Sequence, residues 1–74
     1  MTPQELETAL RVFHSKFTTS KENRIYKVFY QFRRFNIEVY IGSDFIGRQC
    51  YKTTRNAIRR MFEIAPVEQW RILE

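Results

Sequence analysis

The N-terminal residues carry the clearest hydrophobic pattern in the chain. Thr2, Pro3 and Glu5 match a capping box, in which a threonine caps the helix, a proline takes the first helical position and a glutamate reaches back to the cap. Apolar residues then recur at helical spacing, at Leu6, Ala9, Leu10, Phe13 and Phe17. The pattern predicts one helix over residues 3–17, followed by a polar loop over residues 18–23.

Residues 24–51 show the two-residue alternation that is typical of half-buried strands. In the first run, the residues on the predicted inward face are Tyr26, Val28, Tyr30 and Phe32. In the second run, they are Phe35, Ile37, Val39 and Ile41. A third strand is predicted over residues 45–51, with either Ile46 and Cys50 or Phe45 and Tyr51 facing inward. The predicted turns are Arg33-Arg34 and Gly42-Ser43-Asp44.

The segment Lys52-Thr53-Thr54 offers an N-cap for a second helix, which Pro66 ends. The apolar stripe of this helix is Ala57, Ile58, Met61, Phe62 and Ala65. Residues 67–73 fit either a short strand or a turn of helix, and Trp70 is expected to anchor them. We therefore predict a single α+β domain over residues 1–74, in the order α-β-β-β-α. Its three-stranded antiparallel sheet has both helices on one face, with a short C-terminal extension.

Covering one sheet face with both helices leaves the other face open. The predicted register places Lys27, Phe29, Tyr40 and Arg48 on the open face, with Arg33 at its edge. A shift of one residue in this register would turn both aromatic rings inward. The open face is therefore the first candidate surface for binding.

Composition argues against catalysis. The 74 residues (9.1 kDa) include one cysteine, one histidine and two glycines, which excludes a disulfide scaffold, a multi-cysteine zinc site and a glycine-rich phosphate loop. His14 is expected at a helix edge and Cys50 in the core. We expect a cytoplasmic protein with no catalytic site, metal or cofactor, and with neither a membrane span nor a signal peptide.

The positive charge is concentrated in the middle of the chain. The net charge is +5, but residues 24–62 carry nine bases against two acids. Nine of the 13 bases are arginines, which bind phosphate in a forked geometry and stack on flat rings. This pattern favours nucleic-acid binding. The candidate phosphate contacts are Lys52, Arg55, Arg33, Arg34 and Arg48, and the candidate stacking residues are Tyr40 and Phe29.

Three stretches of the chain resemble the double-stranded RNA-binding domain. They are residues 36–41, residues 46–48 and residues 53–57, within an overlap from Thr2 to about Phe62. The resemblance implies minor-groove contacts from the first helix and first hairpin loop, and phosphate contacts from the basic helix start. It favours RNA over DNA. The sequence departs from the family at Thr54, where a lysine is usual, and at Arg33-Arg34, which replaces glycine, proline and histidine.

The alternative function is protein binding. A small basic domain without a catalytic set also looks like the inhibitors or adaptors that phages direct at host machinery, such as RNA polymerase or a nuclease effector. Its arginines would then contact an acidic surface of that protein. A third alternative is a homodimer formed through the open sheet face.

Overall fold

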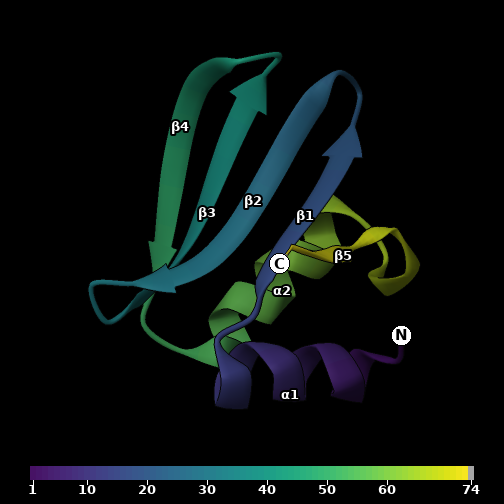
Figure 1. Ribbon diagram of the computed structural model, residues 1–74, viewed down its shortest axis with the longest axis vertical. Helices are drawn as coiled ribbons and strands as arrows, with labels where there is room; N and C mark the ends of the chain where they lie inside the picture. Colours follow the sequence, from purple (N-terminus) through teal and green to yellow (C-terminus); the bar gives the residue numbers. More distant parts are fainter. Residues whose placement is uncertain (74) are drawn as a thin grey trace.

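The computed structural model describes residues 1–73, which fold into two α-helices packed on one face of an antiparallel sheet (Figure 1). The elements are α1 (Pro3–Phe13), β1 (Lys16–Lys21), β2 (Arg24–Gln31), β3 (Arg34–Ile41), β4 (Asp44–Tyr51), α2 (Thr54–Ile64), the short 3-10 helix η1 (Val67–Gln69) and β5 (Arg71–Leu73). Across the sheet, the strand order is β4-β3-β2-β1-β5. The α+β class is as predicted, whereas the three-stranded sheet and the α-β-β-β-α order are wrong.

The strand β1 accounts for most of the error. The predicted helix over residues 3–17 ends at Phe13, because His14 takes a left-handed conformation (φ 48°) and its N–H donates to the Ala9 carbonyl. The predicted loop over residues 18–23 is mostly strand, paired with β2. Phe17 is fully buried as expected, but it reaches the core from β1 rather than from a helix.

The hairpin turns also differ from prediction. The turn between β2 and β3 is Phe32-Arg33, one residue before the predicted Arg33-Arg34, and both residues have positive φ (56° and 59°). Left-handed pairs of this kind match the twist of a two-residue hairpin. Phe32 therefore leaves the inward face, where the alternation had placed it, and is 83% exposed.

The inward face of β4 follows neither predicted alternative. Tyr51 pairs with Phe35 and packs against the core, as one alternative required. A register irregularity between Val39 and Tyr40 then turns Phe45 to the uncovered face, where its ring meets Tyr40 edge-on at 5.6 Å. Cys50, expected in the core, is exposed and lies on the same uncovered face.

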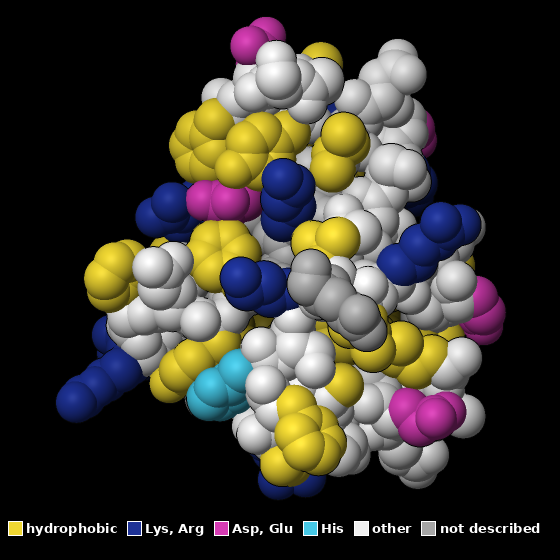
Figure 2. Space-filling model, in the orientation of Figure 1, with side chains coloured by type: hydrophobic (Ala, Val, Ile, Leu, Met, Phe, Trp, Pro, Cys, Tyr) yellow, Lys and Arg dark blue, Asp and Glu magenta, His cyan; other side chains and the backbone are white. Residues whose placement is uncertain are grey.

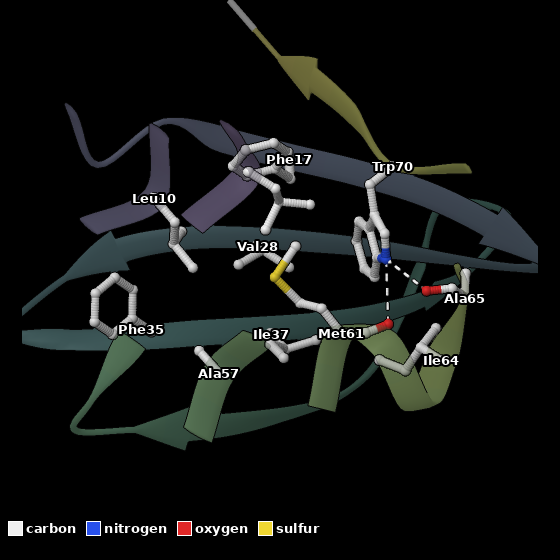
Figure 3. Close-up of a cluster of buried hydrophobic side chains, with 11 residues drawn as sticks. Leu10, Phe17, Val28, Phe35, Ile37, Ala57, Met61, Ile64, Ala65 and Trp70 are labelled. Carbon is white, nitrogen blue, oxygen red and sulfur yellow. Dashed lines mark hydrogen bonds between the residues drawn. The ribbon is translucent and has the colours of Figure 1, made fainter. Parts of the chain in front are cut away.

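The core lies between the helices and the covered face of the sheet (Figure 3). It consists of Leu6, Leu10, Phe17, Val28, Phe35, Ile37, Ala57, Met61, Ile64, Ala65 and Trp70. The capping box of α1 is present as predicted, and within the predicted cap segment 52–54 the residue that caps α2 is Thr53. No buried polar side-chain atom in residues 1–73 lacks a hydrogen-bond partner.

Trp70 anchors the C-terminal segment as predicted. Its ring is 3% exposed, and its indole Nε1–H is shared between the Met61 and Ala65 carbonyls, each at 3.1 Å (Figure 3). Both carbonyls lie at the C-terminal end of α2, and the Met61 carbonyl also accepts from the backbone N–H of Ala65. Both structures considered for residues 67–73 occur, since η1 precedes Trp70 and β5 follows it to pair with β1.

Candidate functional site

Four predicted contact residues gather at one end of the sheet. Arg33 lies in the β2–β3 turn and Arg34 begins β3, while Lys52 and Arg55 lie where β4 leads into α2. Because β4 runs antiparallel to β3 and Tyr51 pairs with Phe35, the two segments meet at this end (Figure 1). All four side chains are exposed. We call Arg33, Arg34, Lys52 and Arg55 the basic end.

The start of α2 adds to the positive potential of the basic end. The first turn of α1 contains Glu5, whose negative charge interacts favourably with the positive end of the helix dipole. The first turn of α2 contains no acid and instead carries Arg55. An arginine there costs the helix a few tenths of a kcal/mol, roughly. This helix start is therefore suited to an anion.

A buried side chain fixes the β2–β3 turn from the uncovered face. Asn36 is 4% exposed, and its Nδ2 donates to the carbonyls of Gln31 (3.2 Å) and Arg34 (3.0 Å), on either side of the turn. Its Oδ1 accepts a hydrogen bond from the Cys50 thiol at 3.2 Å. The amide thus joins both arms of the hairpin to β4.

Stacked rings support the same hairpin from the covered face. The His14 imidazole lies 4.0 Å from the Tyr30 ring, nearly parallel to it. Tyr30 in turn meets Phe35 edge-on at 4.8 Å. Tyr30 and Phe35 pair directly across β2 and β3, one pair before the end of the ladder. The hairpin is therefore held on both faces.

On the uncovered face, the predicted contact residues Arg48 and Tyr40 both hydrogen-bond to an acidic residue. Glu38 accepts hydrogen bonds from Arg48 at 2.8 Å and from the Tyr40 hydroxyl at 2.9 Å. The Lys27 ammonium lies 4.8 Å from the centre of the Tyr40 ring. Figure 2 looks onto this surface and shows hydrophobic, basic and acidic side chains intermingled. A phosphate here would compete with Glu38 for Arg48.

The same hydrogen bond changes the acidity of Tyr40. By accepting from the hydroxyl, Glu38 favours the protonated phenol, and this raises the pKa of Tyr40 above the ordinary tyrosine value. Partial desolvation acts in the same direction, and Arg48 opposes it. Tyr40 therefore remains a neutral hydrogen-bond donor near neutral pH.

A shallow cleft lies beside Glu38 on the uncovered face. Its volume is about 430 Å³, and its lining includes Lys16, Lys27, Phe29, Gln31, Glu38 and Tyr40. Phe29 is partly buried in this surface, so only part of its ring is available for stacking. Phe29, Tyr40 and Arg48 thus lie together on the uncovered face, as predicted. They are separate from the four residues of the basic end.

The histidine, the cysteine and the acidic side chains of residues 1–73 do not gather in one place. Within residues 1–73, no cluster of three or more histidine, cysteine or acidic side chains could hold a metal ion. His14 stacks on Tyr30, and Cys50 contacts Asn36. None of the helices in the described part of the chain is long and apolar enough to cross a membrane.

Sequence reasoning missed Phe32 as a surface residue. Its ring is the most exposed of the large hydrophobic side chains in residues 1–73, and Arg33 follows it directly. The alternation of β2 continues through Phe32, and no glycine, proline or asparagine marks the turn. Had the turn been predicted one residue earlier, at Phe32-Arg33, Phe32 would have been predicted as a surface residue.

Comparisons with known proteins return no match from any protein-family model, curated protein or solved structure. The stretches that resemble the double-stranded RNA-binding domain lie on β3, β4 and α2. The strand β1 stands between α1 and β2, where the order α-β-β-β-α has none.

Proposed function

We propose that this chain binds nucleic acid through the basic end and catalyses no reaction. The observation that carries the proposal is the convergence of Arg33, Arg34, Lys52 and Arg55, from two separate segments, at one end of the sheet. In residues 1–73, these four side chains form no ion pair with an acid. Their charges are therefore free to meet phosphates, in contrast to that of Arg48.

We propose RNA ahead of DNA as the ligand, with double-stranded RNA as the form that the resemblance implies. The support is the resemblance in residues 36–41, 46–48 and 53–57 together with the basic start of α2. Proteins that bind duplex RNA read its shape and its phosphates more than its base sequence. Little discrimination among sequences is expected.

The first prediction reverses two charges of the basic end. Lys52→Glu combined with Arg55→Glu should abolish binding to labelled RNA, because two phosphate contacts become repulsive. The fold should be retained, since neither side chain hydrogen-bonds within residues 1–73 and an acid in the first turn of α2 suits the helix dipole. Fluorescence anisotropy measures binding, and circular dichroism measures folding.

The matched control changes charge by the same amount elsewhere. Arg24 begins β2 at the opposite end of the sheet, and Arg71 begins β5; both are exposed. Arg24→Glu with Arg71→Glu should therefore weaken RNA binding much less. Unchanged affinity of the Lys52 and Arg55 variant for both RNA and DNA would refute the assignment of the basic end.

A second candidate function is binding to an acidic surface of another protein. It is favoured by Phe45 and Ile46, which are 52% and 53% exposed on the edge strand β4. Aromatic side chains beside arginine are common at protein interfaces, and Arg48 lies 5.9 Å from the Phe45 ring. A complex recovered from lysate at low salt should then survive nuclease treatment and be lost in Phe45→Ser. Recovery of RNA alone would argue against this function.

A further inference from the structure

The β2–β3 turn combines strain with exposure. Phe32 and Arg33 both have left-handed backbone conformations, which are unusual for bulky residues and which asparagine and glycine adopt far more easily. Phe32 is also 83% exposed, so burial does not explain the residue type. An asparagine-glycine pair would fit this turn with less backbone strain. A binding role would account for this choice of residues.

The surroundings of the turn keep it in place. Asn36 bonds the carbonyls on either side of it, and the stack of His14 on Tyr30 supports the covered face. The ring is therefore presented on a fixed hairpin rather than on a mobile loop. A backbone that is already ordered loses little further conformational entropy when the turn meets a ligand.

We propose that Phe32 stacks on an unpaired base of the bound RNA while the basic end holds the neighbouring phosphates. This inference rests on the proposed function and adds the kind of RNA that is preferred. Arg33 and Arg34 directly follow the ring in sequence, so phosphates bound there bring the adjoining bases close to it. A fully paired stem offers no free base face along its length, whereas a bulge offers one. The preferred ligand is therefore a duplex interrupted by an unpaired nucleotide.

The test uses two RNA duplexes that differ by one bulged adenosine. The intact protein should bind the bulged duplex more tightly than the paired one, and Phe32→Ala should lower affinity for the bulged duplex about tenfold or more. The same variant should leave affinity for the paired duplex unchanged, and Phe32→Tyr should retain the preference. With 2-aminopurine at the bulge, fluorescence should fall on binding of the intact protein and not of Phe32→Ala.

Phe13→Ala is the matched control, because Phe13 is 72% exposed at the end of α1 but lies outside the turn. It should not alter the preference for the bulge. Phe32→Asn repeats the truncation with a residue that adopts the left-handed conformation readily, which separates loss of the ring from misfolding.

The outcomes separate this inference from the proposed function. If Phe32→Ala and Phe32→Asn bind the bulged duplex as tightly as the intact protein does, while Lys52→Glu with Arg55→Glu does not bind, the stacking role is wrong and RNA binding stands. An equal loss in Phe13→Ala would also overturn the stacking role. If the intact protein binds neither duplex nor their DNA counterparts, both the stacking role and the proposed function are wrong.

Discussion

Glu38 determines what the uncovered face can contact. It lies between two predicted contact residues and accepts a hydrogen bond from each, Arg48 and Tyr40. The Glu38 side chain is only 12% exposed, while that of Arg48 is 47% exposed, so the carboxylate is shielded and the guanidinium is not. Pairing with Glu38 already uses part of the hydrogen-bonding capacity of the Arg48 guanidinium. The uncovered face should therefore bind phosphate more weakly than the basic end does.

The pKa of Tyr40 gives a prediction at the scale of the residue. Ionising the phenol would place its charge beside Glu38, so Tyr40 should titrate above the ordinary tyrosine pKa. The stability from this hydrogen bond is present below the tyrosine pKa of the unfolded chain and is lost as pH rises through the higher pKa of folded Tyr40. Phenolate absorbance should show a component that titrates above the ordinary tyrosine pKa.

Glu38→Gln provides the comparison for Tyr40. The amide carries no charge, so the pKa of Tyr40 should fall toward the ordinary value. If the phenolate titration were the same before and after this substitution, the hydrogen bond between Tyr40 and Glu38 would be absent in solution.

The β2–β3 hairpin gives a prediction at the scale of the element. Replacing Phe32-Arg33 by Asn-Gly supplies residues that tolerate two left-handed conformations. Relief of the strain should raise the free energy of unfolding by about 1–2 kcal/mol. Urea unfolding followed by circular dichroism measures the change. The same replacement removes the Phe32 ring and the Arg33 side chain. The variant should therefore be more stable and yet bind RNA more weakly.

A matched replacement tests the source of this gain. The β1–β2 turn, Glu22-Asn23, also has two positive φ values, but asparagine there already tolerates the conformation. Glu22→Asn with Asn23→Gly should therefore raise stability less than the change at residues 32 and 33. Equal gains in both turns, or no gain at Phe32-Arg33, would mean that the bulky pair carries no special strain.

Local chemistry explains which elements could be predicted from sequence. The start of α1 was predictable because Thr2 and Glu5, three residues apart in sequence, form reciprocal hydrogen bonds between backbone and side chain. The faces of β2 and β3 followed from alternation, except at Phe32 and Ile41, which were expected inward and are exposed. The strand β1 was missed because, apart from Phe17, its residues are polar, and Phe17 also fits the spacing of the helix. Its short partner β5 depends on that pairing and gives little independent signal.

The candidate site was predictable only in part, for reasons that belong to the whole molecule. Charge alone identified Arg33, Arg34, Lys52 and Arg55, and the antiparallel path of β3 and β4 brings them to one end. Sequence could not separate them from Arg48, because its pairing with Glu38 is a contact across strands. Phe32 was placed on the wrong side because a one-residue shift of a turn reverses where the ring lies.

The salt dependence of binding tests the basic end as a unit. Each neutralised phosphate contributes roughly −0.7 to −0.9 to the slope of log K against log salt, so four contacts should give a slope of about −3. Anisotropy from about 50 to 200 mM salt measures this slope. Lys52→Ala should reduce its magnitude by about one, whereas Arg48→Ala should change it less, because that guanidinium already pairs with Glu38. A slope that fell equally in both variants would place the phosphates across the uncovered face instead.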